Sequence, residues 1–281
     1  MIFGVDGTGD FTDKSYKDGM KGSFVSQVCG LTGDAWQPHA LDLSRGRVYW
    51  RGPDATSLFG APKPAVVAKW AEMYHRKGEK VFLTGYSRGA AIVIDAAIEL
   101  STKKIPVEAM FLFDAVNRLS RLDAEIVPGN VRRCYHAVRH PNSGSRNSFG
   151  NCGLKAANSD GFKLKVFEST HGGLGGTPWG KSGLVPAGPM GVTELIQSAA
   201  RANAGGGAAV ITPRQMAAAM VHDEPHKYGN KIYEGAPDWA FTNVTVDQEH
   251  KGMRAVGGWM EKFLRQHGID VSFVYPPLVN L

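Results

Sequence analysis

The chain has little cysteine, no run of five like charges and no long apolar run. Its three cysteines, Cys29, Cys134 and Cys152, are too few and of the wrong parity for a disulfide framework, and no cysteine and histidine spacing typical of a zinc site is present. We therefore expect three free thiols. The formal charge of +6 comes from scattered lysines and arginines, a pattern that does not favour a nucleic-acid partner.

The sequence also lacks a recognisable targeting segment. The first residues, MIFGVDGTGD, have no basic flank and no long apolar stretch, so they do not form a secretory signal. The most apolar stretch, 90–100, is interrupted by Asp95 and Glu99, which argues against a membrane span. We expect a chain made in the cytoplasm, whose export would need a secretion system that does not read a signal peptide.

What is present is an alternation of strand and helix patterns. Helical periodicity predicts helices over 63–78, 88–101 and 252–267. Short apolar runs predict strands over 1–5, 47–50, 80–84, 107–113, 131–138 and 163–168. Strands that alternate with helices predict βαβ units, and so an α/β fold with a mostly parallel sheet flanked by helices.

The composition changes after Gly172. Residues 175–250 are rich in glycine, proline and alanine, and we expect them to form a cap or insertion within a single domain that spans 1–281. Thr212 and Pro213 give one helix start there. The apolar side chains of this segment would line an apolar pocket or pack the cap onto the domain: Trp179, Met190, Met216, Met220, Trp239 and Phe241.

The stretch VFLTGYSRGAAIVIDAA, residues 81–97, places a serine on a sharp turn. Ser87 lies in G-x-S-x-G between a predicted strand and a predicted helix of small residues, the setting that a nucleophile elbow requires. Gly85 and Gly89 would allow the close approach of the neighbouring helix and strand. The alternative is a plain turn between strand and helix.

A serine nucleophile needs a base and an acid at the carboxyl ends of neighbouring strands. Asp114 ends the strand after the Ser87 helix, and His171 follows a later strand, which gives the order serine, aspartate, histidine of an α/β-hydrolase. Either residue could instead serve a local turn, Asp114 together with Asn117. Such a triad needs no cofactor.

Three other histidines are competitors for the base. His136 lies within a predicted strand and is expected to be a core residue, and His140 is expected in a loop. His250, which follows Asp247, is the chief rival of His171.

The oxyanion of the reaction needs backbone N–H donors. We expect one from Arg88, directly after the nucleophile, and one from Gly7 or Thr8 in the DGTG loop after the first strand. The alternative for this loop is an Asp-Gly turn with no catalytic part.

A second motif competes with the elbow. GGTPWGKS, residues 175–182, matches the phosphate-loop pattern G-x-x-x-x-G-K-[ST], with Lys181 and Ser182 at its end. A phosphate loop follows a strand and opens a helix, but GLVPAGPMG comes next and contains two prolines. Nucleotide hydrolysis is therefore disfavoured.

Taken in order, VDGTGD, VYWRGPD, GYSRGA, FDAV, YHAV and THGGLGG resemble the landmarks of a large, mostly bacterial α/β-hydrolase family first catalogued as a domain of unknown function. The family includes the type VI secretion phospholipase effectors of the GxSxG class. The resemblance spans about residues 1–175 and implies Ser87 as nucleophile, Asp114 as acid and His171 as base. This chain has Gly172-Gly173 where the family has Ser-Asp, and Ala115 where it has Thr.

The hypothesis is a serine hydrolase of acyl esters, of the lipase or phospholipase type that the resemblance implies. The partners expected are an acyl ester or phospholipid and, through the positive charge, the surface of an anionic membrane. The alternatives are an esterase of small esters and a catalytically inactive binding module with the same fold.

Overall fold

The structure of the chain is a computed structural model. It describes residues 1–10, 12–32, 36–54, 60–117, 122–178, 191–205, 211, 216, 219–220, 222–224, 232 and 241–276.

Within these residues, seven strands form one sheet, in which only the edge strand β2 runs antiparallel to its neighbour. Across the sheet the strands are β2 (His39–Asp42), β3 (Arg47–Trp50), β1 (Ile2–Val5), β4 (Phe82–Tyr86), β5 (Ala109–Phe113), β7 (Cys134–Arg139) and β9 (Phe162–Phe167). The short strands β6 (Ile126–Val127) and β8 (Lys155–Ala156) pair separately. The six predicted strands are confirmed, whereas β2, β6 and β8 were not predicted.

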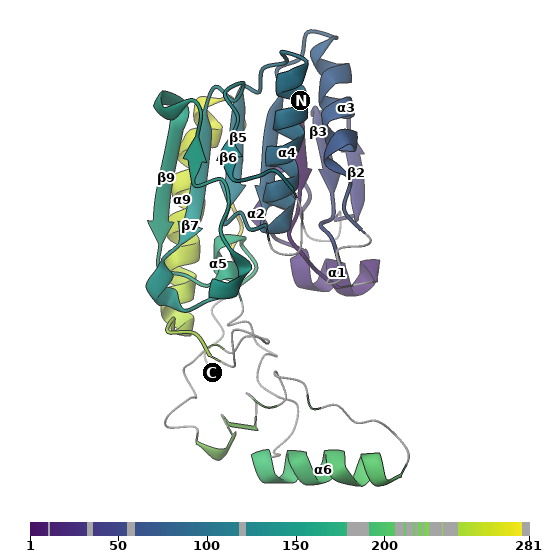
Figure 1. The fold of residues 1–281 in the computed structure, drawn as a ribbon, viewed down its shortest axis with the longest axis vertical. Helices are drawn as coiled ribbons and strands as arrows, with labels where there is room; N and C mark the ends of the chain where they lie inside the picture. The colour runs from purple at the N-terminus through teal and green to yellow at the C-terminus, as the bar shows by residue number, and fades with distance from the viewer. Residues whose placement is uncertain are drawn as a thin grey trace.

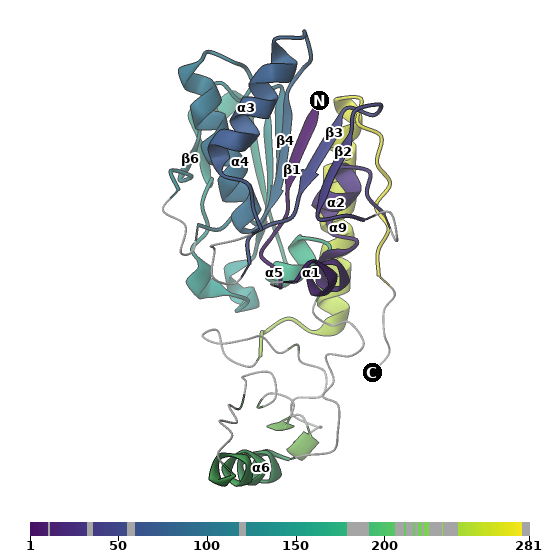
Figure 2. The ribbon, with the colours of Figure 1, turned by 90° about the vertical axis from the view of Figure 1, so that its right-hand side faces the viewer.

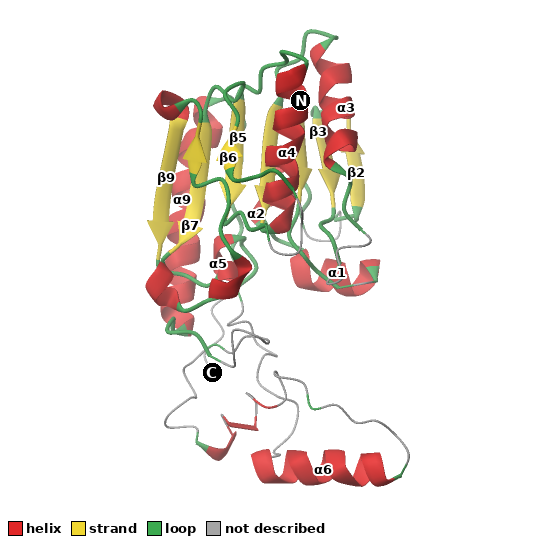
Figure 3. Cartoon of the chain, in the orientation of Figure 1, coloured by secondary structure: helices red, strands yellow, loops and turns green. Residues whose placement is uncertain are grey.

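Helices cover both faces of the sheet (Figure 2). On one face lie α3 (Pro64–His75) and α4 (Arg88–Thr102), and on the other lie α2 (Phe24–Val28) and α9 (Val246–Gln266). This is the α/β arrangement, a mostly parallel sheet flanked by helices, that the sequence predicts. Figure 3 shows the same layers, with the strands in yellow between red helices.

The core has two halves because successive side chains of a strand point to opposite faces. Met110 and Leu112 of β5 join the cluster under α3 and α4, whereas Phe111 and Phe113 join the cluster under α2 and α9. A central parallel strand is buried on both faces, which is why β5 is apolar at every position.

The carboxyl ends of the parallel strands meet at the lower edge of the sheet in Figure 1. The short helices α1 (Asp13–Met20) and α5 (His171–Leu174) lie at this edge. The loops after β1, β4, β5 and β7 therefore end close to one another, which is the place where open α/β sheets carry their sites.

The segment 175–250 contains α6 (Val192–Ala204), which lies beyond the carboxyl edge and apart from the sheet layers (Figure 1). Asp223 accepts a hydrogen bond of 2.9 Å from the Val192 amide and so binds the first turn of α6. The predicted helix start at Thr212 and the side chains of Trp179, Met190 and Trp239 lie outside the described residues. Met216, Met220 and Phe241 are half-buried.

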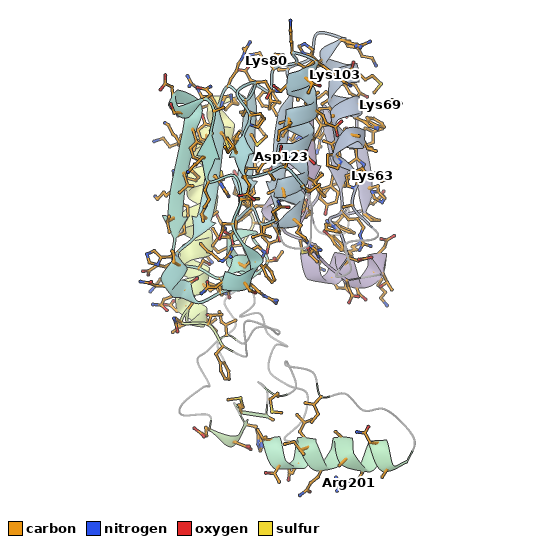
Figure 4. The ribbon with its side chains drawn as sticks, in the orientation of Figure 1. Lys63, Lys69, Lys80, Lys103, Asp123 and Arg201 are labelled. Atoms are coloured by element: carbon orange, nitrogen blue, oxygen red, sulfur yellow. The ribbon has the colours of Figure 1, made fainter. Side chains whose placement is uncertain are left out.

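Three exposed lysines lie away from the carboxyl edge. In Figure 4, Lys69 lies on α3, while Lys80 and Lys103 lie at the opposite, amino edge of the sheet. None of the described helices is both long and apolar enough to cross a bilayer.

Candidate active site

Ser87 occupies a strained turn between β4 and α4. It is the N-cap residue of α4, with φ 56° and ψ −128°, a conformation that residues other than glycine rarely adopt. A Cβ on Gly85 would lie 2.5 Å from Ala90 Cα, and a Cβ on Gly89 would lie 2.2 Å from the Asp6 carbonyl oxygen. The two glycines therefore permit the close helix and strand approach that the elbow motif predicts.

Three side chains that are far apart in the sequence form one chain of hydrogen bonds. Ser87 Oγ lies 2.9 Å from His171 Nε2, and His171 Nδ1 lies 2.6 Å from Asp114 Oδ2. Ser87 follows β4, Asp114 follows β5, and His171 begins α5 after β9. Their exposed fractions are 3%, 0% and 4%, so the contacts are shielded from water.

Asp114 is surrounded by hydrogen-bond donors. Arg139 Nη1 donates to Oδ2 at 2.5 Å, and the Arg139 amide and Asn151 Nδ2 donate to Oδ1 at 3.2 and 2.9 Å. Burial alone would raise the pKa of Asp114, but the charge of Arg139 and the contact with His171 outweigh it and hold the pKa well below its usual value. Asp114 is therefore ionised.

An ionised carboxylate only accepts hydrogen bonds, so His171 Nδ1 must be the donor in its contact with Asp114. Nε2 of the neutral ring is then unprotonated and accepts from the Ser87 hydroxyl. Burial is the main cause that lowers the pKa of His171; Asp114 opposes it, and the charges of Arg139 and Arg146 lower it further. The ring is thus held in the tautomer and charge state that a general base requires.

Neighbouring groups fix the position of His171. Its amide donates to Ser145 Oγ at 2.9 Å, and its carbonyl oxygen accepts from the Tyr86 hydroxyl at 3.0 Å. The imidazole contacts the rings of Tyr86 and Phe149, with centroid distances of 5.1 and 5.4 Å. Both the backbone and the ring of the residue are therefore held in place.

The other histidines have different places. His136 is buried in β7, where Nε2 accepts from the Ala115 amide at 3.1 Å and Nδ1 contacts the Gly153 oxygen at 3.0 Å. Burial lowers the pKa of His136 to about 4, so it is the core histidine that the sequence predicts. His140 caps a short turn after β7. His250 is buried in the first turns of α9, and it is His171 that contacts Ser87.

The loop after β1 lies against the elbow. The Gly7 amide donates to the carboxylate of Asp6 at 2.8 Å, which leaves the Thr8 amide as the candidate oxyanion donor of this loop. Arg88 Nε donates to Thr8 Oγ1 at 2.5 Å, and Arg88 Nη2 donates to the backbone carbonyl oxygen of Asp54 at 2.9 Å. The Arg88 amide begins α4, where backbone N–H groups point out of the helix end. The side chain of Arg88 thus connects the two predicted donor segments.

Asp6 fixes the start of the loop after β1 through buried hydrogen bonds. Its carboxylate accepts from the Ser23 hydroxyl, from the Tyr49 hydroxyl at 2.9 Å and from the Gly7 amide. Burial raises the pKa of Asp6 to about 6, although these hydrogen bonds lower it. The Tyr16 hydroxyl donates to the Gly7 oxygen at 2.6 Å.

The competing phosphate-loop motif begins after a helix. Gly175 is the C-cap of α5, and the Thr177 amide donates back to the Gly172 oxygen at 3.0 Å. The motif is therefore preceded by the helix α5 and not by the strand that a phosphate loop follows. Lys181 and Ser182 lie outside the described residues.

Sequence reasoning did not identify Arg139, Asn151, Ser145 or Phe149. Arg139 is the last residue of β7 and so lies at the carboxyl edge, a position that a search for charged residues at strand ends would have found. The other three come from the irregular segment 143–151, where no period indicates which side chains point inward. Across the described part of the chain, no three histidine, cysteine, aspartate or glutamate side chains lie together as a metal site.

Comparisons with known proteins add distant structural neighbours. No protein-family model and no curated protein matches the chain. An uncharacterized protein from Pseudomonas aeruginosa aligns with 92% of this chain at 13% identity and a TM-score of 0.36, and this chain covers 53%, about half, of its length. The NocB thioesterase domain, in a covalent complex with a fluorophosphonate nocardicin G analog, aligns with 60% of this chain and 84% of its own at 14% identity and a TM-score of 0.33. A Xanthomonas campestris pv. campestris chain assigned to the alpha/beta superfamily of hydrolases aligns with 60% of this chain and 86% of its own at 17% identity and a TM-score of 0.30.

Proposed function

We propose that the chain is a serine hydrolase that cleaves carboxylic esters through an acyl-enzyme on Ser87. The observation that carries the proposal is the continuous hydrogen-bonded path from Ser87 Oγ through His171 to Asp114. A plain turn would need neither the strained backbone of Ser87 nor an imidazole in contact with its hydroxyl.

In the first half of the reaction, Ser87 Oγ attacks the carbonyl carbon of the ester while His171 Nε2 takes the hydroxyl proton. A carbon–oxygen bond forms and the carbonyl electron pair moves onto oxygen. The imidazolium then gives its proton to the oxygen of the leaving alcohol as the second carbon–oxygen bond breaks. Asp114 accepts the Nδ1 hydrogen bond throughout and keeps the ring oriented.

In the second half, water replaces the alcohol. His171 takes a proton from water, the hydroxide attacks the acyl carbon, and the proton returns to Ser87 as the acid is released. The negative charge that forms on the carbonyl oxygen in both halves would be bound by the amides of Thr8 and Arg88, which the Arg88 side chain holds relative to each other.

We propose acyl esters of lipids as the substrate class, on the resemblance to phospholipase effectors. The half-buried Met216, Met220 and Phe241 of the cap would contribute apolar surface for an acyl chain. An anionic bilayer surface is the proposed peripheral contact, because the chain carries a net positive charge.

The test has two steps. A fluorophosphonate probe should label the folded wild-type chain at Ser87 and should not label Ser87→Ala, with circular dichroism to confirm that both are folded. Absence of labelling in the folded wild type would favour the inactive binding module. A series of p-nitrophenyl esters with lengthening acyl chains, together with phosphatidylcholine vesicles with and without phosphatidylglycerol, then determines the substrate class. A preference for the shortest esters would favour a small-ester esterase over a lipase.

A further inference from the structure

Arg139 is a buried cation beside the proposed triad. It is the last residue of β7, and the exposed fraction of its side chain is 3%. Burying a guanidinium is costly unless every donor finds an acceptor. Here Nη1 donates to Asp114 Oδ2 at 2.5 Å. Nε donates to the backbone carbonyl oxygen of Ser145 at 2.7 Å, and Nη2 donates to that of Arg146 at 2.8 Å.

These contacts connect the acid and the base of the triad through one side chain. Arg139 donates to the carboxylate of Asp114 both from its guanidinium and from its backbone amide. It also holds the carbonyl oxygen of Ser145, whose hydroxyl accepts from the His171 amide. The rigid planar fork of a guanidinium suits such a junction better than the single ammonium of lysine.

The charge of Arg139 matters as much as its shape. Arg139 Nη1 and His171 Nδ1 both contact the same oxygen, Asp114 Oδ2. Before the reaction, Asp114 and Arg139 neutralise each other and His171 is uncharged. A proton on His171 would place a second cation on the carboxylate oxygen that already binds the guanidinium.

We infer that Arg139 is a positioning residue of the triad which orients Asp114 and opposes a resting proton on His171, so that hydrolysis continues at mildly acidic pH. The inference rests on the proposed function. It assigns Arg139 no contact with the substrate.

The other groups around His171 either favour or disfavour a proton on its ring. Asp114 favours the imidazolium, whereas burial and the charge of Arg146 disfavour it. Arg146 is held through its carbonyl by Arg139, and its guanidinium lies 4.9 Å from the centre of the Phe149 ring that touches the imidazole.

Two further elements pack near His171. Tyr86 of β4 contributes its ring and hydroxyl, and burial raises its pKa well above the usual value, so it stays neutral. From α9, Glu249 accepts a hydrogen bond from Thr170, the residue before His171, and His250 follows it.

The experiment measures kcat/KM for p-nitrophenyl butyrate between pH 4 and pH 9 in four full-length chains: wild type, Arg139→Met, Arg139→Lys and Arg132→Met. The released phenol is quantified by chromatography, so its own ionisation does not interfere. The acid limb of this profile reports the protonation of the base in the free enzyme. Arg132, an exposed residue two positions before β7 begins, provides the matched control.

We expect the midpoint of the acid limb of the wild type, the pH at which kcat/KM falls to half on the acid side, to lie below 6.5, the ordinary pKa of histidine. Arg139→Met should move it upward by about 1–2 pH units, because a like charge is removed. Arg139→Lys should leave the limb within about 0.5 unit of the wild type and lower kcat at least tenfold, since the charge remains but the fork is lost. Arg132→Met should change neither.

An unchanged acid limb in folded Arg139→Met overturns the inference. If that variant does not fold, a wild-type acid limb at or above pH 6.5, or wild-type kcat in Arg139→Lys, overturns it instead. Failure of the proposed function has a different signature, which is the absence of hydrolysis that depends on Ser87 in the wild type.

Discussion

Replacing Gly89 by alanine tests the packing that creates the elbow. Gly89 is the second residue of α4, and a Cβ there would lie 2.2 Å from the carbonyl oxygen of Asp6 and 2.3 Å from that of Val5. Both obstacles are backbone atoms at the end of β1, so no side-chain rotation relieves the clash. To reach ordinary contact, the start of α4 and the end of β1 must separate by about 1 Å.

The expected magnitudes follow from that displacement. Forcing a methyl group into a packed core costs about 1–3 kcal/mol of the free energy of unfolding, more than the roughly 1 kcal/mol that alanine contributes in a helix. The displacement also separates the Thr8 amide, which follows β1, from Ser87 and Arg88 at the start of α4. A misplacement of about 1 Å in a catalytic arrangement costs on the order of 10²-fold in rate, so we expect kcat to fall by about that factor with a smaller change in KM.

The assay combines urea denaturation with ester hydrolysis, and Gly258→Ala is the matched control. Gly258 lies exposed in α9, and nothing lies within 4 Å of a Cβ built there. That variant should gain about 0.5–1 kcal/mol in the free energy of unfolding and keep its kcat. The reasoning is refuted if Gly89→Ala has both the urea midpoint and the kcat of the wild type.

Three further predictions concern the buried polar groups of the site. Asp114→Asn should lower kcat by about 10⁴-fold, since an asparagine amide that donates to Nδ1 holds His171 in the tautomer whose Nε2 cannot accept the serine proton, and should destabilise the fold by about 3–5 kcal/mol because Arg139 loses its counterion. Thermal unfolding against Ser87→Ala, which keeps that ion pair, measures the second effect; equal stability of the two variants would contradict it. The raised pKa of Asp6, about 6, means that the folded state binds a proton more tightly than the unfolded state. Stability from this group is therefore present at low pH and is lost as pH rises from about 4 to 6, by about 1.4 kcal/mol per unit at most; the difference in unfolding free energy between wild type and Asp6→Asn should follow that curve, and a flat difference speaks against it. Tyr86→Phe should cost about 1–3 kcal/mol, because the buried carbonyl oxygen of His171 loses its hydroxyl donor; chemical denaturation with no loss would show that another donor replaces it.

The strands that the sequence predicted are those whose environment produces a local pattern. The apolar run of β5 reflects burial on both faces, whereas the pattern of β9, FKLKVF, is apolar residues that alternate with lysine in a mostly exposed strand. The edge strand β2 reads HALD and is exposed at alternate positions, so it has too little apolar character to be recognised. The short helix α1 is mostly polar for the same reason, with only Tyr16 and Met20 buried.

Helix boundaries were less well predicted than helix existence. The last helix was expected from residue 252, where its apolar side becomes regular, but α9 begins at Val246. Its first turn is charged, and the signal for it was the capping box formed by Thr245 and Gln248. A search for caps before apolar periodicity would have found this start.

The residues of the site, like the strands and helices, divide into those that a local sequence pattern indicates and those that it does not. By itself, the sequence determined the elbow and the chemical types at the strand ends, because glycine spacing, strand ends and chain order are local features that leave a mark along the chain. Only the tertiary structure decided that the imidazole of His171 contacts Ser87, that the Gly7 amide is engaged by Asp6, and that Arg139 shares the carboxylate of Asp114. Two of these contacts join residues tens of positions apart. All three depend on how neighbouring strands align and how the loops fold over their ends, which no local pattern records.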